Sequence, residues 1–137
     1  MVTIRRSQAN DHAAILEIIK EHELSYPTQT LDNFWVAEEQ GRVVGIASLW
    51  EFRNFFFLSS VGVAASRQHR GVATKLLETL LSGLRKDVYL FTVTPEFFSR
   101  FNFHAVPEPP KGIPHRTIFA CAACTPEACV TMRRKPS

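Results

Sequence analysis

Residues 61–74, Val-Gly-Val-Ala-Ala-Ser-Arg-Gln-His-Arg-Gly-Val-Ala-Thr, link an apolar run to a helical pattern through a short basic turn. The apolar run covers residues 55–63, and the leucines of the helical pattern follow Val72. A helix N-terminus offers unpaired N–H groups and the positive end of the helix dipole, which together attract phosphate groups. Gly71 has no Cβ and lets the backbone come close to such a ligand. This stretch therefore predicts a site for a phosphorylated ligand.

The rest of the chain alternates between expected strands and expected helices. Apolar runs predict strands at residues 3–6, 34–38, 42–52, 55–63, 88–93, 104–106 and 128–133. Helical spacing and capping signals predict helices at residues 11–23, 72–84 and 95–101. This order indicates an α/β, or α+β, layered domain with helices on both faces of a mixed sheet. A length of 137 residues without an internal repeat predicts one domain, residues 1–137.

The composition narrows the class of protein. With 45% hydrophobic and 21% charged residues, the chain is typical of globular proteins and not of disordered ones. The net charge of +3 suits an anionic ligand, but the longest basic run is residues 133–135, so we expect no nucleic-acid partner. No apolar stretch reaches membrane-spanning length, so we expect no membrane partner. Three cysteines and no signal-like N-terminus indicate a cytoplasmic protein.

Two motifs then suggest a family. Residues 68–73 fit the pattern Gln/Arg-x-x-Gly-x-Gly/Ala, and with Val61 and Val63 on the preceding strand they resemble the acetyl-CoA motif of the GNAT family of N-acetyltransferases. A later run, Phe-Phe-Ser-Arg-Phe-Asn-Phe at residues 97–103, is similar to the family's aromatic-aromatic-x-x-Leu-Gly-Phe segment. The resemblance covers nearly the whole chain and extends to the order of its elements. It implies the GNAT fold: a mixed sheet of six to seven strands, flanked by about four helices and splayed between the fourth and fifth strands.

The resemblance also implies roles for these residues, with acetyl-CoA as cosubstrate and no metal. Backbone N–H groups of residues 68–74 would bind the CoA pyrophosphate, and Arg67 and Arg70 would add charge. The Val61 N–H would donate to the thioester oxygen, where negative charge develops. Phe97 and Phe98 would line the acyl arm, although a role as core aromatics fits their spacing equally well. The implied cofactor-binding residues are Val61, Val63, Arg67, Gln68, His69, Arg70, Gly71, Val72, Ala73, Thr74, Phe97 and Phe98.

The chain departs from the family pattern near the chemistry. Many members have a tyrosine that protonates the CoA thiolate where this chain has Phe98, so acid catalysis from that position is not expected. A thiolate needs little help to leave, because a thiol pKa is about 8.5. Asn102 replaces the family's glycine and tolerates the same left-handed conformation. As a candidate base we select Glu51, for which an exposed carboxylate at the end of a strand is the alternative interpretation.

The acceptor is the least defined part of the prediction. Residues 91–103 resemble the branch of the family related to N-acetylglutamate synthase, and the tail is similar to that of small members associated with arsenic resistance. This resemblance implies an amino-acid-like acceptor whose carboxylate Arg116 could bind, although Arg116 also fits a surface loop. Cys121, Cys124 and Cys129 do not complete a four-ligand zinc pattern, so we expect thiols and no metal.

The leading hypothesis is direct transfer of an acetyl group to a small amine or amino acid in a ternary complex. The alternatives are a non-catalytic CoA-binding or regulatory module, and an enzyme that acetylates protein N-termini. The sequence leaves the oligomeric state open, with a homodimer among the possibilities.

Overall fold

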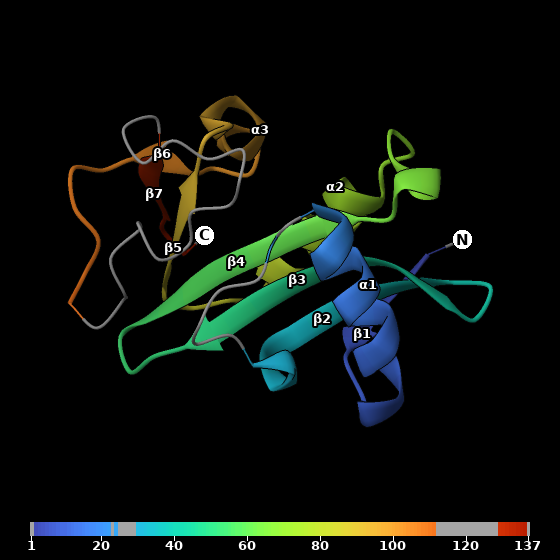
Figure 1. The fold of residues 1–137 in the computed structure, drawn as a ribbon. Coiled ribbons are helices and arrows are strands. Elements are labelled where there is room, and N and C mark those ends of the chain that lie inside the picture. Colours follow the sequence, from blue (N-terminus) through green and yellow to red (C-terminus); the bar gives the residue numbers. More distant parts are fainter. Residues whose placement is uncertain (1, 23, 25–29, 112–128, 137) are drawn as a thin grey trace.

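A mixed sheet forms the centre of the computed structural model, which describes residues 2–22, 24, 30–111 and 129–136. Among these residues, seven strands lie in the order β1-β2-β3-β4-β5-β7-β6, and the pair of β4 and β5 is the one parallel pair (Figure 1). The strands are β1 (Thr3–Arg6), β2 (Phe34–Glu39), β3 (Arg42–Glu51), β4 (Phe55–Val63), β5 (Asp87–Thr92), β6 (His104–Ala105) and β7 (Val130–Arg134). The predicted mixed sheet of six to seven strands is therefore confirmed.

Helices cover both faces of the sheet. The α-helices are α1 (His12–His22), α2 (Val72–Leu81) and α3 (Pro95–Ser99), and the 3-10 helices are η1 (Ala9–Asp11), η2 (Leu31–Asn33) and η3 (Ala65–Arg67). The described part of the chain thus has three α-helices, where about four were expected. α2 ends three residues before the predicted boundary because Gly83, with a φ of +79°, takes the left-handed conformation that stops a helix.

The core is split by the sheet into two main layers. Neighbouring residues on a strand point to opposite faces, so Ile46 of β3 packs with α1 and Ala47 packs with α2. Three isoleucines of α1 cover the first face, and four leucines of α2 cover the second. Burial on both faces explains the nearly continuous apolar sequence of β3 and β4. None of the described helices is long and apolar enough to span a membrane.

The middle of β4 is distorted by a bulge. The register with β3 shifts between Ile46 and Ser48, so that Ser60 and Val61 both lie opposite Ala47. Ser60 has a φ of +52°, which is unusual for a residue with a side chain. An extra residue of this kind bends a strand and redirects its backbone groups. The bulge therefore lies at the part of β4 that the sequence motif singles out.

The pairing of β4 with β5 ends just before this bulge. Residues 55–57 of β4 pair with residues 87–89 of β5, and the last pair is Phe57 with Tyr89. Both strands continue further, β4 to Val63 and β5 to Thr92. Beyond this point β4 and β5 are no longer paired with each other, and residues 57–63 of β4 line a pocket.

An ion pair fixes the first strand to the start of α1. The Arg5 guanidinium donates to both carboxylate oxygens of Asp11, at 2.7 and 3.0 Å, and Asp11 also accepts from the Gln8 N–H at 2.7 Å. The Asp11 side chain is only 7% exposed. The Arg5 hydrogen bonds, followed by the bond from Gln8, hold the pKa of Asp11 below its ordinary value despite burial. This cluster is structural, because it lies outside the pocket.

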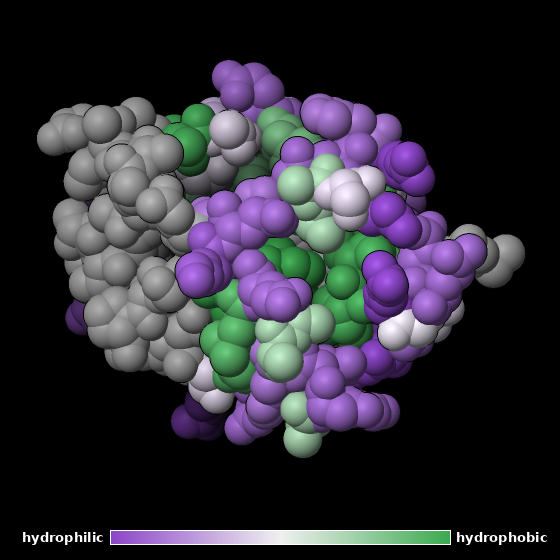
Figure 2. Space-filling model, turned by 45° about the vertical axis from the view of Figure 1, so that its right-hand side comes forward, coloured by the Kyte–Doolittle hydropathy of each residue, from purple (hydrophilic) through white to green (hydrophobic). Residues whose placement is uncertain are grey.

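In the coloured part of the face shown in Figure 2, hydrophilic side chains surround a depression near the centre, and hydrophobic residues gather in that depression.

Candidate functional site

A pocket of about 880 Å³ lies where β4 and β5 stop pairing. Residues 57–63 of β4 form one wall, and the end of β5 with residues 93 and 94 forms another. The remaining lining comes from the loop at residues 67–69, the start of α2 at residues 71–74, the aromatic rings of α3 with Arg100, and the end of α1. Most of the predicted motif therefore lines a cavity whose volume is large enough for an extended ligand.

The loop before α2 has the geometry expected of an anion site. Gly71 is the N-cap of α2 with a φ of +77°, and a Cβ placed on it would meet nothing within 4 Å. Glycine is thus required by the backbone conformation, and the space beside it is open. His69 also has a positive φ, of +64°, although it carries a side chain. Backbone strain of this kind is often retained where a ligand binds.

The charges around this loop differ from the expected ones. Arg67 lines the pocket, but its Nε donates to Glu39 at 2.7 Å, and this bond holds the pKa of Glu39 below its ordinary value. Arg70 is exposed and is not among the lining residues. Both arginines were predicted to contact phosphate, and the structure brings only Arg67 to the pocket, already paired with a carboxylate.

Arg100 supplies a positive charge that the sequence analysis did not assign. Its guanidinium lies over the rings of Phe97 and Phe101, 5.0 and 5.7 Å from their centroids. One Nη donates to the Thr74 hydroxyl at 3.4 Å, across the start of α2. The side chain is exposed and lines the pocket. It is therefore held by aromatic rings at the pocket wall that faces the helix N-terminus.

The aromatic residues of α3 line the pocket as predicted. Phe97 and Phe98 are partly exposed and meet edge to face, with centroids 5.0 Å apart. Phe98 also contacts the fully buried Phe103, which ties the pocket wall to the core. Asn102, at the end of this segment, has a φ of +68°, so its predicted left-handed conformation is confirmed.

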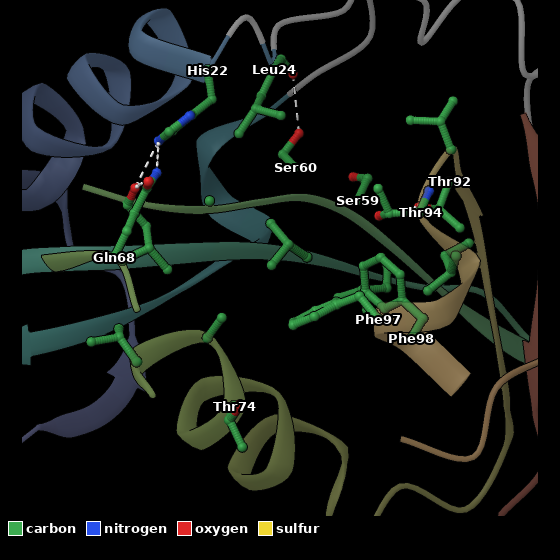
Figure 3. Close-up of a pocket in the computed structure, with 18 of the residues that line it drawn as sticks. His22, Leu24, Ser59, Ser60, Gln68, Thr74, Thr92, Thr94, Phe97 and Phe98 are labelled. Atoms are coloured by element: carbon green, nitrogen blue, oxygen red, sulfur yellow. Dashed lines mark hydrogen bonds between the residues drawn. The ribbon is translucent and has the colours of Figure 1, made fainter. Parts of the chain in front are cut away.

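Hydroxyl groups occupy the other side of the pocket. Figure 3 shows Thr92 and Thr94 across the cavity from Gln68, with Ser59 beside them. The hydroxyls of Thr92 and Thr94 are 3.1 Å apart, and the Thr94 N–H donates to the Thr92 hydroxyl at 2.9 Å. The cavity thus has one end with Arg67 and Arg100 near the start of α2, and a neutral polar end at Thr92 and Thr94.

Glu51 does not join the other site residues. Its side chain is 66% exposed and pairs with Lys86 at 2.8 Å, and it lies opposite Phe56 where β4 and β5 are still paired. It is not among the lining residues, so its position does not support the predicted role as base. Arg116, Cys121 and Cys124 lie outside the described residues. Cys129 is partly exposed, and the described residues contain no group of three or more His, Cys, Asp or Glu side chains that could hold a metal ion.

We expect Glu51→Gln to retain at least half of the wild-type turnover, because the carboxylate is outside the pocket. The measurement is the initial rate of thiol release from acetyl-CoA, the reaction that the family resemblance implies, at a saturating amine concentration. Lys86→Met, which removes the partner of Glu51, is the matched control and should behave alike. A loss of more than a hundredfold in Glu51→Gln alone would restore Glu51 as the base.

The pocket also contains residues that the sequence analysis missed. They include His22, Leu24, Ser59, Ser60, Thr92, Thr94 and Arg100. Arg100 could have been predicted from the sequence, because it is the basic residue within the aromatic motif at residues 97–103. Nothing in the sequence indicated His22, because it lies within the last turn of the helix predicted at residues 11–23.

Comparison with known protein families assigns the chain to one of them. A family model described as an acetyltransferase (GNAT) domain matches residues 30–105, which is more than half of the chain. The chain belongs to the GNAT acetyltransferase family. The matched range contains β4, the loop at residues 64–71, α2 and α3, so most of the pocket lining lies within it, and only His22 and Leu24 of the lining lie before it. The predicted family is therefore confirmed, and this is a family of N-acetyltransferases.

Solved structures show the same fold. N-acetylglutamate synthase from Neisseria gonorrhoeae, complexed with coenzyme A and N-acetyl-glutamate, has a TM-score of 0.74 at 17% identity. That match covers 100% of this chain and 35% of the synthase, so this GNAT chain spans about a third of the synthase's length. An acetyltransferase of the GNAT family from Staphylococcus aureus has a TM-score of 0.75 at 16% identity and covers 100% of both chains.

A third structure is diaminobutyrate acetyltransferase from Paenibacillus lautus, in complex with L-2,4-diaminobutyric acid and coenzyme A. It has a TM-score of 0.68 at 19% identity, over 99% of this chain and 95% of that one. At these identities the three likenesses establish the GNAT fold of this chain.

Proposed function

We propose that this GNAT chain is an acetyl-CoA-dependent N-acetyltransferase that acts on a small, amino-acid-like amine by direct transfer in a ternary complex. The observation that carries the proposal is the pocket at the end of the β4–β5 ladder, with the α2 N-terminus at its basic end. Solved relatives of the same fold are complexed with coenzyme A and with amino acids or their acetylated forms. We further propose that residues 1–137 act as one domain in the cytoplasm.

The residues present fit acetyl-CoA. The open space at Gly71 and the free N–H groups of the first turn of α2 suit a pyrophosphate. Val63 presents its backbone on the edge of β4 that faces away from β3, since the next residue, Ala64, donates to Val44 on β3. An extended amide-containing arm can pair with such an edge as an added strand would. Acetyl-CoA would supply the thioester.

The protein's part in the reaction is mainly orientation and charge stabilisation. The bulge at Ser60 and Val61 turns the backbone at the centre of the pocket, where the Val61 N–H would donate to the thioester carbonyl oxygen. Holding amine and thioester together replaces a bimolecular encounter by a single bound geometry. Phe97 and Phe98 would keep water from the acyl arm, and Thr92 and Thr94 would orient a polar acceptor at the neutral end.

We propose that Arg100 provides the phosphate charge that was predicted for Arg67. Arg100→Ala is expected to weaken coenzyme A binding about tenfold to a hundredfold, the usual effect of losing a charge-assisted hydrogen bond. Arg67→Ala should weaken it no more than about threefold, because Arg67 is already paired with Glu39. Titration calorimetry with coenzyme A measures both, and the exposed Arg53, outside the pocket, serves as control through Arg53→Ala. Equal losses in the Arg67 and Arg100 variants would contradict the assignment.

A thiol-release assay over a panel of amines and amino acids tests the proposed reaction. The expected result is release of coenzyme A with one or a few amino-acid-like acceptors, and acetylated products of matching mass. A non-catalytic CoA-binding module remains the second candidate, favoured by Phe98, which has no hydroxyl to act as an acid. Binding of coenzyme A without thiol release on the whole panel would select that candidate.

A further inference from the structure

The last turn of α1 is bound to the cofactor edge of β4 through two consecutive side chains. Glu21 accepts a hydrogen bond from the Ala65 N–H at 3.0 Å, at the start of the loop that leads to α2. The Nε2 of His22 lies 2.7 Å from the Val63 carbonyl oxygen, on the edge of β4 that faces the pocket. Figure 3 shows His22 reaching from α1 to meet Gln68 at this point.

The geometry defines which groups donate. A carbonyl oxygen only accepts, so the His22 Nε2 must carry its proton to bond Val63 at this distance. The Gln68 amide nitrogen, 3.3 Å from the same oxygen, is a second donor. The 3.5 Å contact between Gln68 and His22 then joins two donors and is not a hydrogen bond. Val63 thus has both carbonyl lone pairs occupied, a short bond to His22 and a longer one to Gln68.

Packing fixes the helix end against the strand at the same place. A Cβ on Gly62 would lie 2.9 Å from Leu24 Cδ1, 3.2 Å from Ile18 Cγ2 and 3.4 Å from His22 Cδ2. The chain after α1 and the face of α1 therefore rest directly on the backbone of β4. A displacement of this helix end would move the Val63 carbonyl and the Ala65 amide with it.

We propose that Glu21 and His22 are positioning residues of the cofactor site, a role that rests on the proposed function. His22 holds the Val63 carbonyl in the direction that a pantetheine amide requires. Glu21 holds the Ala65 N–H at the start of the loop that leads to α2. The longer bond from the exposed Gln68 is the one that yields when an amide N–H of the cofactor arrives. The short bond from His22 remains and keeps the strand edge in place.

Variants at position 22 separate hydrogen bonding from packing. His22→Gln keeps an N–H donor at the end of the side chain, whereas His22→Met keeps a similar length without one. We expect His22→Met to raise the Kd for coenzyme A and the KM for acetyl-CoA about tenfold, and His22→Gln to restore both to within about threefold. The KM for the acceptor should change less than twofold in either variant. A purely structural role predicts equal losses for the two variants and for both substrates, in step with the loss in Tm.

Variants at position 21 provide a measurement that does not need the cofactor. Glu21→Ala should raise the hydrogen-exchange rate of the Ala65 amide at least tenfold, while Glu21→Gln, which keeps an acceptor oxygen, should leave it near the wild-type value. Glu17→Ala, an exposed residue one turn earlier on α1, is the control. Unchanged exchange in Glu21→Ala overturns the role of Glu21 even if the position 22 variants fail to fold.

The two proposals fail in different ways. If the wild-type chain binds no coenzyme A, the proposed function fails, and the positioning role fails with it. If the wild-type chain binds coenzyme A and His22→Met binds it equally well, the positioning role alone is wrong.

Discussion

Replacing Gly71 with glutamate is expected to abolish acetyl-CoA binding and acetyl transfer without unfolding the protein. The space beside Gly71 is open, so the new side chain fits but places a carboxylate where the pyrophosphate would lie. Two like charges about 4 Å apart repel each other by about 4 kcal/mol near a protein surface. Wild-type protein should gain a few degrees in Tm with saturating acetyl-CoA, and the variant should gain none.

Gly83→Glu is the matched control for this experiment. Gly83 has a φ of +79°, against +77° for Gly71, and a Cβ there also meets nothing within 4 Å. Both variants therefore impose a similar backbone strain of about 1–2 kcal/mol, but Gly83 lies beyond the far end of α2. Gly83→Glu is expected to keep both the rise in Tm with saturating acetyl-CoA and the wild-type rate of thiol release. Loss of both in the two variants alike would show that strain, and not the phosphate site, explains the result.

Replacing Asp11 with asparagine is expected to lower the free energy of unfolding by about 2 kcal/mol at pH 7. Asparagine keeps the size of the side chain but loses the charge that holds the bidentate bond to Arg5, at 2.7 and 3.0 Å. For a chain of this length the loss corresponds to roughly 8 °C in Tm. Urea unfolding at pH 7 measures the difference directly.

The effect of this substitution should depend on pH in a defined direction. The folded-state pKa of Asp11 is lowered, mainly by its hydrogen bonds to Arg5, so the stability it contributes is fully present above the unfolded-state pKa of about 3.9. That stability is lost as the pH falls through the folded-state pKa, and the difference between wild type and Asp11→Asn should shrink accordingly. Asp32→Asn, at an exposed aspartate, is the control. A difference that stays constant from pH 7 to below pH 3 would contradict the assignment.

The sequence predicted the strands well because each has a clear apolar period between turn residues. The observed bounds of β1 and β4 equal the predicted ones, β2, β3 and β6 differ by one residue at the C-terminal end, and β5 is shifted by one residue at both ends. The largest difference is in β7, which begins two residues later and ends one residue later than predicted. The bulge in β4 was not predicted, since nothing in residues 55–63 distinguishes a bulged strand from a regular one. It depends on the pairing with β3, which is a property of the folded sheet.

The proposed cofactor site could be recognised in the sequence because most of it lies in one continuous stretch, residues 61–74, most of which lines the pocket. The availability of the charged side chains could not be predicted, because it depends on ion pairs with residues distant in the sequence. Arg67 pairs with Glu39, and Glu51 pairs with Lys86. His22 and Arg100 reach the pocket from α1 and from the segment after α3, and a spacing rule within one motif does not detect such residues. The assigned acceptor residue, Arg116, lies outside the described residues and stays a prediction.

A crystal structure of the protein with acetyl-CoA tests the central claim most directly. The account predicts the pyrophosphate against the backbone N–H groups of residues 69–74, the extended arm along Val61 and Val63, and Arg100 within hydrogen-bonding distance of a phosphate oxygen. Acetyl-CoA bound at another surface, with the space between β4 and β5 left empty, would contradict it.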